Sequence, residues 1–151
     1  MQLDAATFTW PVRVYFEDTD AAGVVYYANF LKFFERCRTE WLRALGINQV
    51  EMAAREHLQF VVASMTVDYR LPARLDEELI VHASIEHLRG APLTFAQEAR
   101  RAGALLASAR VRVACVDNRR WAPAPLPPVL RALLAPRRRV SQPFFSRIDR
   151  P

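Results

Sequence analysis

Two aspartates and a glycine, Asp18, Asp20 and Gly23, directly precede the one long amphipathic helix that the sequence predicts. A carboxylate before a helix start lies near unpaired backbone N–H groups and the positive end of the helix dipole, which stabilise negative charge by about 0.3–1 kcal/mol at exposed sites. Such a carboxylate stays ionised, and it can attack an acyl carbon or deprotonate a water molecule that does so. The same N–H groups can polarise a carbonyl oxygen. The segment therefore predicts acyl-transfer chemistry.

Gly23 and Asp18 each allow more than one role. Gly23 allows a substrate to approach closely or gives the chain a positive φ angle, and its commoner role is the turn alone. Asp18 is more often a capping or turn carboxylate than a second catalytic group.

Other interpretations of Asp18-Thr-Asp20 fit the neighbouring residues less well. An Asp-x-Asp phosphatase needs threonine or valine where Ala22 stands and a downstream lysine, whereas Lys32 lies inside the predicted helix. A calcium loop needs oxygen ligands at alternate positions, which Ala22 and its neighbours do not supply. His57, His82 and His87 also lack the spacing of metal ligands. The sequence therefore predicts no metal.

The elements that position this segment are a strand and a helix. The sequence predicts a helix over residues 30–45 that is ended by Gly46. Its opposite face is charged, and its buried face consists of apolar residues spaced three and four positions apart. These residues are Phe30, Phe33, Phe34, Cys37, Trp41 and Leu45. Before them, Phe8, Trp10, Val12, Val14 and Phe16 alternate with other residues and predict a strand with one buried face.

The rest of the chain predicts an antiparallel sheet. Asn48, with Glu51 three residues on, predicts the N-cap of a short second helix. Long strands follow over residues 58–71, 76–89, 92–101 and 104–117, and their short connections favour an antiparallel meander. About five strands and one long helix indicate an α+β fold in which a curved sheet wraps around the helix. Its exposed edges predict a dimer with strands paired across a two-fold axis.

Composition narrows the class of protein further. A chain of 151 residues with 52% apolar content fits one compact domain, predicted over residues 1–128, followed by a partly flexible basic tail over 129–151 that begins with a helical turn or two. The tail carries the net charge, because residues 1–130 balance fifteen basic against fifteen acidic groups. We therefore expect no nucleic-acid binding. Cys37 and Cys115 are predicted to be buried thiols. No apolar span or leader is apparent, which predicts a cytoplasmic protein without a membrane span.

A longer stretch of sequence resembles a known family. The stretch Arg13-Val-Tyr-Phe-Glu-Asp-Thr-Asp-Ala-Ala-Gly-Val-Val-Tyr-Tyr-Ala-Asn-Phe30, continued by Phe34-Glu-Arg-Cys-Arg-Thr-Glu40, is similar to the signature of hotdog-fold acyl-CoA thioesterases of the 4-hydroxybenzoyl-CoA thioesterase class. The nearest branch is the YbgC type, which is associated with the Tol-Pal envelope system. The similarity continues through Met65-Thr-Val-Asp-Tyr69, Pro72-Ala-Arg-Leu-Asp76 and Val113-Ala-Cys-Val-Asp117, over most of residues 8–128.

The resemblance implies an activity and a set of site residues. It implies hydrolysis of an acyl-CoA or acyl carrier protein thioester without a cofactor, by a homodimer or homotetramer with active sites at the subunit interface. Asp20 takes the catalytic position, and the backbone N–H of Tyr27 polarises the thioester carbonyl. Gly23 and Tyr26 are the expected substrate-binding residues. An alternative is a non-catalytic acyl-thioester-binding or Tol-Pal partner protein, for which the arginines of the tail would contact anionic lipid or an acidic carrier protein.

The chain departs from the YbgC branch at Tyr27, where that branch commonly has histidine. Tyrosine is not a base at neutral pH. We expect the change to be mild, because the backbone N–H at this position is the group implied to act on the carbonyl.

Overall fold

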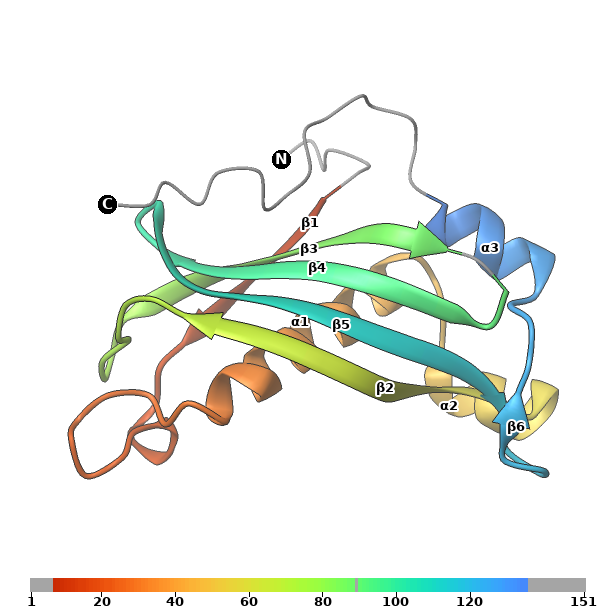
Figure 1. The fold of residues 1–151 in the computed structure, drawn as a ribbon, viewed down its shortest axis with the longest axis horizontal. Helices are drawn as coiled ribbons and strands as arrows, with labels where there is room; N and C mark the ends of the chain where they lie inside the picture. Colours follow the sequence, from red (N-terminus) through yellow and green to blue (C-terminus); the bar gives the residue numbers. More distant parts are fainter. Residues whose placement is uncertain (1–6, 89, 136–151) are drawn as a thin grey trace.

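The fold consists of one curled antiparallel sheet and a long helix that lies against it. A computed structural model describes residues 7–88 and 90–135, apart from the side chain of His87. In chain order, the elements in Figure 1 are β1 (Phe8–Arg13), a 3₁₀ turn (Phe16–Asp18), α1 (Asn29–Ala44), α2 (Gln49–Glu51), a π-helical turn (Met52–Glu56), β2 (Leu58–Tyr69), β3 (Glu78–Leu88), β4 (Pro92–Arg101), β5 (Ala104–Asp117), β6 (Ala122–Pro123) and α3 (Pro128–Leu134).

The strand order is β1-β3-β4-β5-β2, with every neighbouring pair antiparallel and β6 added to β5. The predicted meander holds for β3, β4 and β5 but is wrong for β2, which pairs with β5 and not with the strand that follows it. The connection over residues 70–77 does not turn back on itself. It crosses the end of the sheet, where Ala73 O accepts from Val25 N at 2.8 Å and Glu77 O accepts from Val14 N at 2.9 Å. β2 is thereby left at one edge.

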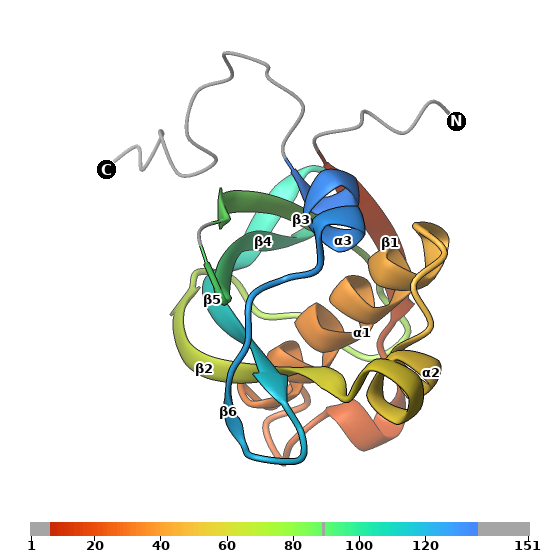
Figure 2. The same cartoon turned by 90° about the vertical axis from the view of Figure 1, so that its right-hand side faces the viewer.

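The sheet curls around α1, as Figure 2 shows along the length of the helix. Phe33, Phe34 and Cys37 of the predicted stripe are fully buried, and α1 packs mainly over β1, β3 and β4. Gly46 follows the helix with a φ of 84°, which is the left-handed conformation that favours glycine. The predicted α+β hotdog arrangement, with the helix inside the curled sheet, is confirmed.

The first strand is shorter than predicted. It ends at Arg13, and Phe16 is 81% exposed because residues 16–18 form a separate 3₁₀ turn. Phe16 therefore does not join the buried face of this strand. The predicted cap of the second helix is confirmed, since the Asn48 side chain accepts from Glu51 N at 3.0 Å.

The C-terminal helix α3 packs back on the sheet. Its Leu134 is buried, and the Arg131 side chain donates to the backbone oxygens of Leu88 and Gly90 at 3.4 and 2.9 Å. The basic segment from residue 136 onward lies outside the described residues, so its flexibility stays a prediction. In the part of the chain that is described, no helix has the length and apolarity required to cross a membrane.

Both thiols are buried and free, as predicted. Burial raises the pKa of Cys37 to about 12 and also raises that of Cys115. Both groups are therefore protonated at neutral pH.

Candidate active site

Asp20 begins a tight hairpin loop between the first strand and α1. An antiparallel bridge joins Thr19 to Val25, and inside it Asp20 N donates to Val24 O at 2.9 Å. The Asp20 carboxylate accepts from Ala22 N at 2.8 Å, and its backbone oxygen accepts from Gly23 N at 2.9 Å. The Asp20 side chain is exposed at the tip of this loop and has no ion-pair partner among the described residues. Its orientation is fixed by the loop backbone.

Gly23 closes the hairpin turn. Its φ of 78° lies in the left-handed region, and a Cβ atom built there would have no heavy atom within 4 Å. The turn therefore requires glycine for its backbone angle and not for close packing.

Asp18 holds this loop against the helix. Its side chain is buried and accepts from Tyr15 N at 2.8 Å, which caps the 3₁₀ turn that Asp18 ends. Its backbone oxygen accepts from Tyr26 N and from Asn29 Nδ2, both at 2.9 Å. These bonds are those of a capping carboxylate and support the expectation that Asp18 has a structural role.

The start of α1 carries two open backbone donors. Tyr26 N, Asn29 N and Phe30 N each have a backbone acceptor, but Tyr27 N and Ala28 N donate no hydrogen bond to any acceptor in the described part of the chain. The N-cap residue of α1, Ala28, has no side chain that could cap the helix. These N–H groups are free to bind an oxygen atom of another molecule.

Four aromatic rings surround this helix start. Tyr26 and Tyr27 lie 4.7 Å apart between ring centroids, and Tyr69 from the end of β2 meets Tyr27 and Phe30 edge-on at 6.1 and 5.8 Å. The Tyr69 hydroxyl donates to Tyr27 O at 2.8 Å. Tyr69 is not among the site residues predicted from the sequence, although it belongs to a stretch that carries the family resemblance. The available signal was a large aromatic residue at the end of a predicted strand, within that stretch.

The phenols of Tyr26 and Tyr69 are neutral hydrogen-bond donors at neutral pH, because the pKa of each is raised. The pKa of Tyr26 is raised mainly by its interaction with the Tyr27 phenol and also by the negative charge of Asp20. Burial, followed by electrostatic interaction with the Tyr27 phenol, raises the pKa of Tyr69. Asp20 and Tyr26 thus lie within electrostatic reach of each other, as their shared hairpin implies.

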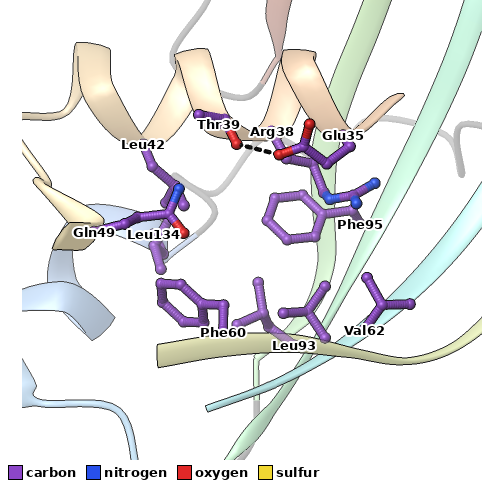
Figure 3. Close-up of a pocket in the computed structure, with 11 residues that line it drawn as sticks. Glu35, Arg38, Thr39, Leu42, Gln49, Phe60, Val62, Leu93, Phe95 and Leu134 are labelled. Atoms are coloured by element: carbon purple, nitrogen blue, oxygen red, sulfur yellow. Dashed lines mark hydrogen bonds between the residues drawn. The ribbon is translucent and has the colours of Figure 1, made fainter. Parts of the chain in front are cut away.

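A cavity of about 120 Å³ lies farther along α1, between the helix and β2 (Figure 3). Glu35, Arg38 and Thr39 line it from the helix, and Phe60 and Val62 line it from β2, with residues of α2, β4, β5 and α3 completing the wall. The predicted site residues do not line this cavity. Sequence periodicity did not predict it, because it depends on which half of the sheet the helix covers.

Comparison with known proteins identifies the family. The sequence model of the thioesterase-like superfamily matches residues 14–134. The chain belongs to the thioesterase-like superfamily. The matched range of this thioesterase-like protein contains the Asp20 loop, α1, the strands from β2 onward and α3, and it begins directly after β1.

Individual members of the superfamily resemble the chain over most of its length. The acyl-CoA thioesterase YbgC of Haemophilus influenzae is 44% identical over 125 residues, which cover 83% of this chain and 92% of that protein. The acyl-CoA thioester hydrolase YbgC of Escherichia coli strain CFT073 is 47% identical over 126 residues, covering 83% and 93%. The crystal structure of a probable thioesterase from Bartonella henselae superposes with a TM-score of 0.77 at 37% identity, covering 81% of this chain and all of that one. The family resemblance predicted from the sequence is confirmed.

Proposed function

We infer that this protein hydrolyses acyl-CoA thioesters to a free acid and CoA. The inference is supported by two YbgC relatives named as acyl-CoA thioester-cleaving enzymes, each aligned over more than nine tenths of its length at 44–47% identity. The structural observation that carries it is the pairing of a fixed, exposed carboxylate at Asp20 with open backbone donors at Tyr27 and Ala28. A thioester needs these two groups: one to deliver an oxygen nucleophile and one to stabilise the oxyanion.

Asp20 and the helix start take complementary roles in the reaction. The thioester carbonyl oxygen accepts from Tyr27 N–H, which stabilises the negative charge that develops on it. In a base route, Asp20 removes a proton from water, the oxygen adds to the carbonyl carbon, the C–S bond breaks, and the proton passes to the departing thiolate. In a nucleophile route, a carboxylate oxygen of Asp20 adds instead, the thiolate leaves, and water hydrolyses the mixed anhydride.

The side chain at position 27 has a supporting role in this mechanism. The Tyr27 ring is 60% exposed and packs against Tyr26 and Tyr69, while its backbone provides both the open N–H and the oxygen that Tyr69 binds. This arrangement favours a backbone role and supports the expectation that tyrosine in place of histidine is a mild change. Gly23 and Tyr26 border the same loop and contact the substrate.

The functional unit in this proposal is a dimer formed through β2. β5 pairs with one side of β2, and its other side has no strand partner among the described residues. Residues 62–69 on this edge are mostly exposed, and they include Val62 and Tyr69. An open edge of this length would expose a row of backbone donors and acceptors, and pairing with a second copy satisfies them. Assembly into tetramers, binding to acyl carrier protein and a cytoplasmic location stay predictions.

The test is hydrolysis of a panel of short, long and aromatic acyl-CoAs, followed through release of the CoA thiol. Turnover of at least one class above the uncatalysed rate supports the proposal. A folded protein that binds acyl-CoAs but cleaves none of them would overturn it and favour the non-catalytic binding alternative. No observation on the described residues favours that alternative or a Tol-Pal role.

A further inference from the structure

The cavity beside α1 contains a buried cation in an otherwise mainly apolar wall. Arg38 is 7% exposed and makes no ion pair with a carboxylate among the described residues. Its Nη1 donates to Gln97 Oε1 at 2.8 Å, and Gln97 is itself fixed because its Nε2 donates to Phe34 O at 3.0 Å. The guanidinium also lies 6.0 Å from the centroid of the Phe95 ring. Arg38 is therefore held rigidly in place.

Most of the hydrogen-bonding capacity of Arg38 is unused. A guanidinium has five N–H donors, and Gln97 takes a single hydrogen bond from it. No buried side-chain nitrogen or oxygen in the described chain lacks a partner, so the guanidinium nitrogens without a bond must be accessible. The cavity is the space that Arg38 lines. Burial lowers the pKa of Arg38, while the charge of Glu35 opposes this change, so an added acceptor would relieve an unfavourable environment.

The proposed dimer places this cavity at the active site of the other subunit. Antiparallel self-pairing of residues 62–69 about their midpoint sets Val62 opposite Tyr69 of the partner subunit. Val62 lines the cavity, and Tyr69 is bonded to Tyr27 at the helix start. A thioester held at the Tyr27 amide of one subunit can thus extend its acyl group into the cavity of the other. The inference below rests on the proposed function and on this pairing.

We propose that Arg38 determines acyl specificity by binding an oxygen atom at the far end of the acyl group. An acyl chain that ends in a methyl group would leave the guanidinium donors desolvated and unpaired, whereas a terminal hydroxyl or carboxylate accepts from them. The protein then prefers acyl groups that carry a distal oxygen acceptor over methyl-terminated chains of the same length. Glu35 and Thr39, which bond to each other at 2.7 Å on the same wall, allow a hydroxyl group to donate as well as accept.

The test compares three substrates of equal chain length: hexanoyl-CoA, 6-hydroxyhexanoyl-CoA and adipyl-CoA. The wild-type protein is expected to show a higher kcat/KM for one or both oxygenated substrates, and the two arms separate a hydroxyl from a carboxylate. Arg38→Met, which keeps side-chain length without charge, should reduce this preference by about tenfold to a hundredfold, as expected for a hydrogen bond to a charged group. The readout is the ratio of kcat/KM for each oxygenated substrate to that for hexanoyl-CoA, which a general loss of turnover does not change.

Arg36→Met is the matched control, because Arg36 lies on the same helix, is exposed and does not line the cavity. It should leave the preference unchanged. If Arg38→Met fails to fold, Arg38→Lys replaces it, since lysine keeps the charge but lacks the planar guanidinium with its several N–H donors. Arg38→Lys should lower the ratio of 6-hydroxyhexanoyl-CoA turnover to hexanoyl-CoA turnover. Equal kcat/KM values for the three substrates, or a preference that survives loss of Arg38, would overturn the inference while leaving the thioesterase proposal intact. Failure to cleave any thioester would instead overturn that proposal.

Discussion

The hydroxyl of Tyr69 donates to the backbone oxygen of Tyr27 at 2.8 Å, and this bond ties the end of β2 to the start of α1. Tyr27, whose open N–H is proposed to bind the thioester, is therefore held through its backbone oxygen by β2. Tyr69→Phe should cost about 0.5–1.5 kcal/mol of stability, as measured by chemical denaturation, and lower kcat more than it raises KM. A variant that loses this stability but keeps the wild-type kcat would show that the bond supports the fold alone.

Asp20→Asn tests the catalytic carboxylate directly. The Asp20 side chain is exposed and its bond from Ala22 N can be kept by the asparagine oxygen, so the variant should fold and melt like the wild type. Its kcat should fall by about a hundredfold or more, because an amide neither accepts a proton nor attacks an acyl carbon. The control is Glu17→Gln in the adjoining 3₁₀ turn, since the Glu17 side chain is also exposed. Equal losses in the two variants would remove Asp20 from the mechanism.

Asp18 should behave in the opposite way. Its buried carboxylate accepts from Tyr15 N, and Asp18→Ala leaves that donor without an acceptor. We expect a loss of about 1–3 kcal/mol in the free energy of unfolding, measured by urea denaturation. Activity should fall because the loop loses its anchor, and the defect should lessen in Asp18→Asn, which keeps an acceptor oxygen. A stable Asp18→Ala variant without turnover would contradict the structural role.

Local patterns were sufficient to predict the parts of the fold that depend on near neighbours. The helix predicted over residues 30–45 forms as Asn29–Ala44, because its apolar spacing and Gly46 define both a face and an end. The strands predicted over residues 92–101 and 104–117 form with those bounds, since the intervening Ala102-Gly103 adopts the positive φ angles of a tight turn. The Asp20 loop could be predicted for the same reason.

The missed features depend on contacts between distant segments. Pairing of β2 with β5 is set by the crossing of residues 70–77 over the end of the sheet, which no pattern within β2 encodes. The contact of Tyr69 with Tyr27 joins residues 42 positions apart. The cavity at Arg38 exists because α1 covers β1, β3 and β4 and leaves space above β2. Periodicity identifies buried faces, but it does not identify their partners.

The two cysteines should be unreactive in the native protein. Cys37 is fully buried, and its pKa, raised to about 12, keeps it protonated at pH 8, where an ordinary thiol is partly ionised. The thiolate fraction would become appreciable only as the pH approaches that value. A thiol reagent at pH 8 should therefore label neither Cys37 nor Cys115 until denaturant is added, and release of CoA can be followed without background. Rapid labelling of Cys37 in the native protein would show that α1 opens locally.

The edge of β2 provides the most informative test, because it links assembly to activity. Ser64 and Thr66 are exposed on this strand. Changing both to glutamate brings like charges together across a two-fold axis and should prevent self-pairing, while pairing of β2 with β5 is kept because Arg112 and Arg110 lie opposite these positions. Sedimentation should then give a monomer, with circular dichroism unchanged. Since the cavity of one subunit faces the Tyr27 amide of the other in the proposed dimer, thioester turnover should fall together with dimer content.

Lys32→Glu, on the exposed face of α1, is the control for a surface charge change and should remain dimeric. A fully active monomer would mean that each chain holds a complete site. An acyl group bound at Tyr27 would then have to extend along α1 of the same subunit to reach Arg38, about 16 Å away at a helical rise of 1.5 Å per residue.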